Sequence, residues 1–250
     1  MICRACVVLE NCPRTLFLSR YFDGIRPDAD IGTTLIVVSG ILRLSTKYCI
    51  DPLRQKCIEI LKRKIPTSSL TEMDATFGLH VDGVGYAEFS ADICFSMINL
   101  ARETNIPELL PFAFYLCARL PTNVVLNGTP TAASVLSWND KAICLAGRIE
   151  LSEAQRALSE KTVDRWISTT SCSKRGVFCY GAISAEWRRL IDLVGIVVLE
   201  TFPPATVTQP CAHSVEHARS QLQEGRKQVW DMLPKVFQLG SWEDVRNSKN

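Results

Sequence analysis

The stretch VSGILRLSTKYCIDPLRQKCIEIL (Val38–Leu61) predicts two short helices that pack on each other. Apolar residues recur in both halves at the spacing of one helix face. They are Leu35, Val38, Ile41, Leu42 and Leu44 in the first helix and Leu53, Cys57, Ile60 and Leu61 in the second. Asp51 suits the cap of the second helix, with Pro52 at the first helical position, where its missing N–H costs nothing. We therefore expect an antiparallel hairpin whose apolar side packs against a neighbour.

Basic residues accompany the second helix of this hairpin, at Arg54, Lys56, Lys62 and Lys64. We expect them to point away from the apolar face and into solvent. Elsewhere lysine and arginine alternate with aspartate and glutamate, and the net charge of the chain is +2. Nucleic-acid-binding proteins concentrate positive charge on one surface, so a nucleic-acid partner is not expected.

The 250 residues are 47% apolar and 22% charged, which is typical of a folded globular protein. Several of the 11 cysteines lie in apolar stretches, where cysteine behaves as a small buried hydrophobic residue. These are Cys49, Cys57, Cys94, Cys117 and Cys144. The first residues lack a signal-peptide pattern, and the longest apolar run, Leu190–Leu199, is about half the length of a membrane span. The sequence predicts an intracellular protein of the cytoplasm or nucleus that does not enter the membrane.

Further helices are predicted along the middle of the chain. One begins near Ser90, and the next, Glu108–Arg119, has so few polar positions that we expect it to be largely buried. Residues Pro121–Ala132 have the composition of a loop. Ser137 is expected to cap one helix, and a capping-box pattern at Ser152–Gln155 predicts the start of another.

The C-terminal part is predicted to be helical as well. Residues Trp187–Glu200 indicate a buried helix or strand, and Thr201–Pro210, with three prolines, indicates a linker. The final helix, Ser214–Leu233, is expected to end at Pro234, with an apolar tail that packs back on it. The tryptophans are interpreted as core and inter-helix anchors. They are Trp138, Trp166, Trp187, Trp230 and Trp242.

Three groups of specific residues go beyond this general patterning. They are Phe22–Gly24 with Val38–Tyr48, Leu53–Cys57 and Pro66–Thr67; then Ile98–Tyr115; then Gly225–Asp244. In these residues the chain resembles BTB/POZ-domain proteins of mushroom-forming fungi. The resemblance implies a mainly α fold, with residues 1–66 forming an incomplete BTB/POZ-like region and residues 67–250 an α-helical C-terminal region. The helical pair corresponds to the closing part of a BTB/POZ domain, and residues 1–21 lack the strand-and-helix pattern that opens one.

The resemblance implies a non-enzymatic protein–protein interaction module, a scaffold or adaptor. Proteins of this family typically dimerise, and many connect a partner to another complex, including cullin-type ubiquitin ligases. The expected partners are therefore other proteins, among them a second copy of the chain or a cullin-type ligase. Apolar helix faces that the missing strands leave uncovered are the expected docking surfaces.

Two alternatives depend on the C-terminal cysteines and histidines. Cys172, Cys179, Cys211 and His213, with His217 as a substitute, could supply the four ligands of a zinc site. The chain would then be a small zinc-stabilised regulatory or DNA-associated protein. A cysteine hydrolase would instead require a low-pKa thiol beside His213 or His217. No nucleotide-binding loop, zinc-protease motif or nucleophile elbow occurs, so neither catalytic residues nor a cofactor are expected.

Overall fold

The computed structural model describes residues 30–77, 89–129, 134–167, 179, 181–182, 184–185, 195–200 and 211–248, with side chains of the long helix up to residue 159. Within these ranges the chain forms nine α-helices, one 3-10 helix and no strand, which confirms the predicted mainly α fold. The elements are α2 (Ile31–Lys47), α3 (Asp51–Lys62), α4 (Leu70–Phe77), α5 (Ala91–Glu103), η2 (Pro107–Leu109), α6 (Leu110–Ala118), α7 (Thr122–Asn127), α8 (Trp138–Ile167), α10 (Ala212–Val236) and α11 (Trp242–Asn247).

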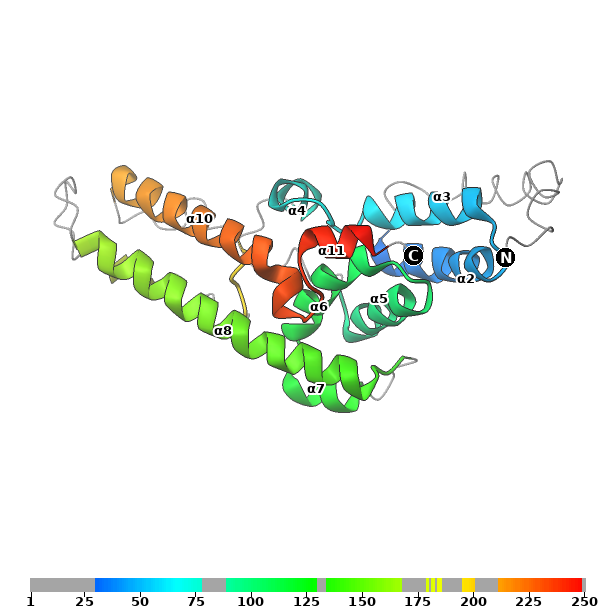
Figure 1. The fold of residues 1–250 in the computed structure, drawn as a ribbon. Coiled ribbons are helices and arrows are strands. Elements are labelled where there is room, and N and C mark those ends of the chain that lie inside the picture. The colour runs from blue at the N-terminus through cyan, green and yellow to red at the C-terminus, as the bar shows by residue number, and fades with distance from the viewer. Residues whose placement is uncertain are drawn as a thin grey trace.

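The predicted hairpin is present, since α2 and α3 lie side by side and are joined by residues 48–50 (Figure 1). The turn between them includes Cys49, which has a φ of 54° and is exposed to solvent. The expectation that Cys49 is buried is therefore wrong, because this residue lies outside both helices. Helix α3 begins at Asp51, one residue earlier than predicted. Ile50 is the cap, Asp51 is already helical, and no side chain caps this helix.

Most of the predicted apolar stripe lies inside the hairpin. Val38 and Leu42 of α2 are fully buried, as are Cys57 and Leu61 of α3. Leu44 is different, because 56% of its surface is exposed, and its assignment to the inner face is wrong. The reason is geometric: Leu44 follows Leu42 by two residues, which is a rotation of about 200° around the helix.

Two of the basic residues of α3 also depart from the expectation. Arg54 donates hydrogen bonds to the carbonyls of Thr104 (2.9 Å) and Asn105 (3.2 Å), and Lys62 forms an ion pair with the buried Glu108. Neither side chain is simply solvated, because Arg54 lies beside the end of α5 and Lys62 lies beside Glu108 of η2. The last carbonyl groups of a helix lack intrahelical partners and attract cations.

The centre of the molecule is α6, which α5, α8 and α10 contact (Figure 1). All nine of its residues are buried, which confirms the prediction for this segment. Helix α5 begins where predicted, with the Ser90 hydroxyl accepting a hydrogen bond from the Ile93 N–H. The core is one continuous apolar cluster that includes residues from α2 to α10.

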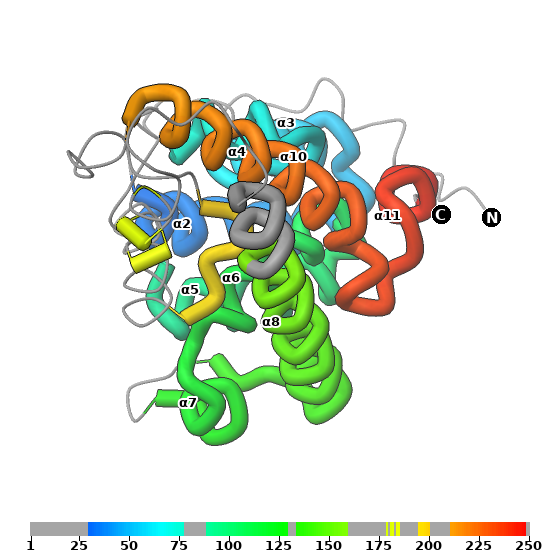
Figure 2. The backbone as a smooth tube through the Cα atoms, turned by 90° about the vertical axis from the view of Figure 1, so that its left-hand side faces the viewer, coloured from blue at the N-terminus to red at the C-terminus, as the bar shows by residue number. Residues whose placement is uncertain are grey.

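Two predictions for residues 121–167 are wrong. Thr122–Asn127 form α7, which packs beside α8 (Figure 2), where a loop was expected. Helix α8 begins at the predicted cap Ser137, whose hydroxyl accepts the Asp140 N–H (3.1 Å), and then continues without interruption to Ile167. Ser152 does not start a new helix. Its hydroxyl donates to the Arg148 carbonyl (2.8 Å), one turn back in the same helix.

Gln155 has a different role from the predicted cap. Its side chain accepts the Val197 N–H (2.7 Å) and donates to the Gly195 carbonyl (3.1 Å). Residues 196–200 are buried, as expected, but they form turns and not a regular helix or strand. Gln155 therefore holds this distant buried segment against the middle of α8. The predicted linker, Thr201–Pro210, lies outside the described residues.

Helix α10 runs beside α8 (Figure 1) and extends two residues beyond Pro234, where it was expected to end. A proline removes the hydrogen bond to the carbonyl four residues earlier, which here belongs to Trp230. The Trp242 indole N–H donates to that carbonyl instead (2.8 Å), and the two rings stack with their centroids 5.2 Å apart. The apolar tail thus packs back, as predicted.

Candidate interaction surface

The outward side of α2 is the most distinctive apolar surface of the hairpin. We call it the α2 outer face and define it by Thr33, Ile36, Gly40, Leu44 and Lys47. These residues are spaced by three or four positions, so they lie along one side of the helix. Ile36 is 79% exposed and Leu44 is 56% exposed, although the opposite side of the same helix is fully buried. Two large apolar side chains are therefore presented to solvent one turn on either side of a glycine.

The α2 outer face is held rigidly in place. Val38 and Leu42 anchor the helix from behind, and Arg43 at its edge forms an ion pair with Glu103 of α5. At the start of the helix, the Asp30 carboxylate accepts hydrogen bonds from the Thr33 hydroxyl and N–H. These bonds lower the pKa of Asp30, because they stabilise its charged form. The face thus has an acidic beginning and a basic end at Lys47.

The sequence prediction did not identify the two exposed residues of the α2 outer face. Leu44 was assigned to the inner side, and Ile36 was not singled out at all. The signal was present in the sequence, because both residues lie at helical spacing from Gly40 and not from Val38 and Leu42. In a helix that is rich in apolar residues all round, however, spacing alone does not say which stripe is covered.

A second exposed apolar region lies on α8. Ile149, 63% exposed, lines a groove of about 590 Å³ between α7 and α8 together with Leu145 and Arg156. Trp138 at the start of α8 is 76% exposed, so its interpretation as a core anchor is wrong. The Lys141 ammonium lies 4.5 Å from the centre of the Trp138 ring and forms a cation–π contact with it, although the ring is not buried.

The other tryptophans have mixed outcomes. Trp230 is buried and Trp242 is half-buried against it, as expected for inter-helix anchors. The side chains of Trp166 and Trp187 lie outside the described part of the chain.

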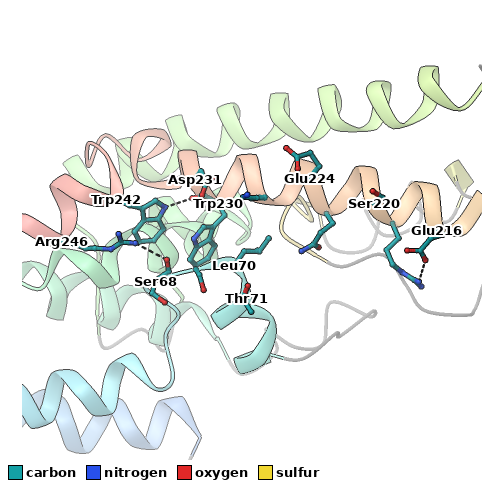
Figure 3. Close-up of a pocket in the computed structure, with 14 residues that line it drawn as sticks. Ser68, Leu70, Thr71, Glu216, Ser220, Glu224, Trp230, Asp231, Trp242 and Arg246 are labelled. Atoms are coloured by element: carbon teal, nitrogen blue, oxygen red, sulfur yellow. Dashed lines mark hydrogen bonds and ion pairs between the residues drawn. The ribbon is translucent and has the colours of Figure 1, made fainter.

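A larger groove of about 890 Å³ runs between α4, α10 and α11 (Figure 3). Its wall includes the stacked Trp230 and Trp242, and Arg246 closes one end by donating to the Ser68 carbonyl (3.2 Å). The charged side chains of its lining alternate in sign and are Glu216, Arg219, Glu224, Lys227, Asp231 and Arg246. Equal numbers of acidic and basic groups give this groove no charge preference for a ligand.

The structure brings together two of the four candidate zinc ligands. The Cys211 N–H donates to the Cys179 sulfur (3.3 Å), and the Cys211 thiol donates to the Ser214 hydroxyl (3.0 Å). His213 is exposed, and Cys172 lies outside the described residues. Across the residues that the structure describes, no three Cys, His, Asp or Glu side chains are placed to hold a metal ion.

The core thiols are unsuited to nucleophilic chemistry. Burial raises the pKa of Cys57 and of Cys94 to about 12. The pKa of Cys117 is also raised, by its hydrogen bond with the Cys144 thiol and by burial. All three are therefore protonated at neutral pH, whereas a catalytic cysteine reacts as the thiolate.

Comparison of the chain with protein-family models, with curated proteins and with solved structures gives no match. The BTB/POZ resemblance accordingly stays a prediction from the sequence. None of the helices in the described ranges combines the length and the apolarity needed to cross a membrane.

Proposed function

We propose that this protein is a non-enzymatic protein-interaction module that docks another protein chain on the α2 outer face. The observation that carries the proposal is the exposure of Ile36 and Leu44 on a helix that is fixed by the core behind it. Covering a large aliphatic side chain contributes ~1.5–3 kcal/mol, so two such residues supply a useful part of a binding energy. The helix is already ordered, so docking costs little conformational entropy.

The BTB/POZ resemblance supports the same function. It implies a scaffold or adaptor that links a partner protein to a larger complex such as a cullin-type ubiquitin ligase, in the cytoplasm or nucleus. The rigid apolar face is the type of surface that such an adaptor presents to a partner helix.

The proposal is tested by comparing matched baits. Wild-type protein and the double variant Ile36→Glu/Leu44→Glu are used to capture proteins from extracts of the source cells, with Ile149→Glu as the control for an equally exposed apolar residue on α8. A captured protein should be lost with the double variant and kept with Ile149→Glu. Binding is then remeasured with the purified partner. A partner that all three baits bind equally contradicts the proposal.

A zinc-stabilised regulatory or DNA-associated protein is the second candidate, and the contact between Cys211 and Cys179 favours it. The metal content of purified protein, of Cys179→Ser and of Cys211→Ser distinguishes the two functions. Stoichiometric zinc that both substitutions remove supports this candidate. Metal-free wild-type protein eliminates it.

A further inference from the structure

We propose that Cys179 and Cys211 form a reversible disulfide when the protein is exposed to a peroxide, and that this bond ties the start of α10 to Cys179. Cys211 directly precedes α10 and is not part of the α2 outer face. The inference therefore goes beyond the proposed interaction function and does not depend on it. It gives these two cysteines a redox role that requires no metal ion.

The two cysteines are already in contact. The Cys211 N–H donates a hydrogen bond to the Cys179 sulfur over 3.3 Å. Because that nitrogen is bonded to the Cα atom of Cys211, the Cys179 sulfur lies within ~5 Å of this Cα atom. Bridged cysteines have their Cβ atoms ~3.5–4.5 Å apart, so this approach is close enough for a bond without a large movement of the backbone.

Both residues are thiols in this structure, and the Cys211 thiol is turned toward the first turn of α10. It donates a hydrogen bond to the Ser214 hydroxyl over 3.0 Å. A rotation about the Cα–Cβ bond of Cys211 moves its sulfur from Ser214 toward Cys179. A thiol is a weak donor, so this rotation gives up only a weak hydrogen bond.

Exposure and position assign different roles to the two thiols. Cys211 is partly exposed whereas Cys179 is fully buried, so a small oxidant from solvent meets Cys211 first. Cys211 also lies at the positive end of the 25-residue helix α10, and a helix start favours the reactive thiolate. Cys179 is then the partner that closes the bond.

A second thiol pair, in the core, lacks this access to solvent. The hydrogen bond with Cys144 and burial both raise the pKa of Cys117, and both side chains are fully buried. The Cys117–Cys144 pair should therefore resist the same oxidant. It is the internal control for the Cys179–Cys211 pair.

The reaction consumes one peroxide molecule. The Cys211 thiolate attacks a peroxide oxygen, the O–O bond breaks, and the departing hydroxide takes up the thiol proton as water, which leaves a sulfenic acid on Cys211. The Cys179 sulfur then attacks the Cys211 sulfur, the S–S bond forms and the S–O bond breaks. The departing hydroxide takes the Cys179 proton as a second water. A dithiol reverses the reaction by thiol–disulfide exchange and is itself oxidised.

The bond closes a loop that contains a buried segment. Residues 196–200 lie between the two cysteines in the sequence and are buried. Gln155 of α8 and Arg226 of α10 bind the backbone of this region, the latter by donating to the Leu199 carbonyl (2.9 Å). A disulfide that closes a loop restricts the unfolded chain, so oxidation should hold this segment and the start of α10 more firmly.

The first test is peptide mapping. Reduced full-length protein is treated with a chelator to remove any bound metal and then with hydrogen peroxide, after which free thiols are alkylated and the protein is digested without reductant. Mass spectrometry should find peptides joined through Cys179 and Cys211 before any joined through Cys117 or Cys144, and dithiothreitol should separate them. Oxidation that leaves Cys179 and Cys211 unlinked, or that joins Cys211 to another cysteine, overturns the inference.

Matched variants test the two roles. Cys179→Ser and Cys211→Ser should both abolish the linked peptides, whereas Cys117→Ser should keep them, because it removes a thiol of the core pair instead. Cys179→Ser should also accumulate a sulfenic acid on Cys211, which dimedone labels. Labelling of Cys179 in Cys211→Ser at the same rate would overturn the assignment of Cys211 as the thiol that meets the oxidant.

The tether is tested separately by stability. Oxidised wild type should melt several degrees above the reduced protein and should exchange the Val197 amide hydrogen more slowly. Dithiothreitol should reverse both changes, and Cys211→Ser should show neither. If the disulfide forms but both measurements stay the same, the bond does not tie down this region and that part of the inference is wrong.

Failure here is distinguishable from failure of either proposed function. Cys211→Ser leaves Ile36 and Leu44 unchanged, so capture of a partner by the α2 outer face is measured independently. Zinc content is measured before the chelator is added, whereas the disulfide is sought after the metal has been removed.

Discussion

Two helix pairs in this protein are built in different ways. The α2–α3 pair joins neighbouring segments through residues 48–50, whereas α8 and α10 are separated by residues 168–211. In the first pair, the apolar spacing of one short stretch indicates both contact faces. In the second, contact depends on glycines opposite large side chains: Gly225 lies against Leu158, and Gly147 lies against Phe237. The pairing of α2 with α3 thus follows from local apolar spacing. The pairing of α8 with α10 depends on the fit between glycines and large side chains.

The largest loss of stability is expected where a contact between distant helices buries a charge. Asp74 of α4 pairs with Arg226 of α10, 152 residues away, and the Arg226 side chain is only 2% exposed. Asp74→Ala removes the carboxylate with which this buried cation forms its ion pair, so the free energy of unfolding should fall by ~3–5 kcal/mol in urea denaturation. The double variant Asp74→Ala/Arg226→Met should recover part of the loss. A loss for Asp74→Ala similar to that of a surface ion pair, below ~1 kcal/mol, contradicts this prediction.

Shape matching between the distant helices should have the next largest effect. A Cβ atom at Gly147 would overlap the Phe237 ring, so Gly147→Ala should lower the free energy of unfolding by ~1–3 kcal/mol. Gly40→Ala is the matched control in the hairpin. It faces open space and should stabilise the protein by up to ~1 kcal/mol, because alanine favours a helix more than glycine does. Thermal unfolding measures the stability of both variants. Equal changes for Gly147→Ala and Gly40→Ala would show that the contact of Gly147 with Phe237 does not limit the size of the residue at that position.

A contact within the C-terminal segment should matter less. Trp242→Phe removes the hydrogen bond to the Trp230 carbonyl that Pro234 leaves without a helical donor, and should cost ~1 kcal/mol. Trp138→Phe changes an exposed ring and should remain within ~0.5 kcal/mol of the wild type. If both substitutions have the same effect on chemical denaturation, the indole hydrogen bond does not stabilise the packing of Trp242 on α10.

The smallest effect is expected from a local carboxylate and depends on pH. Burial acts to raise the pKa of Glu72, but hydrogen bonds from Ser68, Thr67 and Ser69 outweigh it and lower the pKa below its ordinary value of 4.5. Its stabilisation is therefore complete above pH 4.5 and is lost as the pH falls through the lowered pKa. Melting temperatures measured against pH should show this loss in the wild type and not in Glu72→Gln. A variant that parallels the wild type at every pH would show that the Glu72 charge is not coupled to folding.

Parts of the fold were predictable because their causes lie within a few residues. The caps at Ser90 and Ser137 and the fully buried α6 follow from serine hydroxyls at helix starts and from the lack of polar residues in one segment. The capping-box pattern at Ser152 was misleading for the same reason. It is identical inside a helix and at its start, and only the preceding turn of α8 shows which applies.

The candidate site was predicted in kind but not in detail. An uncovered apolar helix face was expected, and the structure has one on α2. Its two exposed apolar residues were not predicted. Ile36 was not identified, and Leu44 was assigned to the side that Val38 and Leu42 bury. Of the zinc candidates, Cys179 and Cys211 are adjacent, which no spacing rule shows for residues so far apart in the sequence.

By itself, the sequence determined where α5 and α8 start, that α6 is buried and that α2 and α3 pack on each other, because backbone hydrogen bonding and apolar periodicity act over short distances. Only the tertiary structure decided which side of α2 stays in solvent, that α8 continues past Ser152, that Arg54 binds the end of α5 and that Lys62 pairs with Glu108 of η2. Each of these outcomes depends on a neighbour brought in from elsewhere in the chain. A local pattern carries no information about that neighbour.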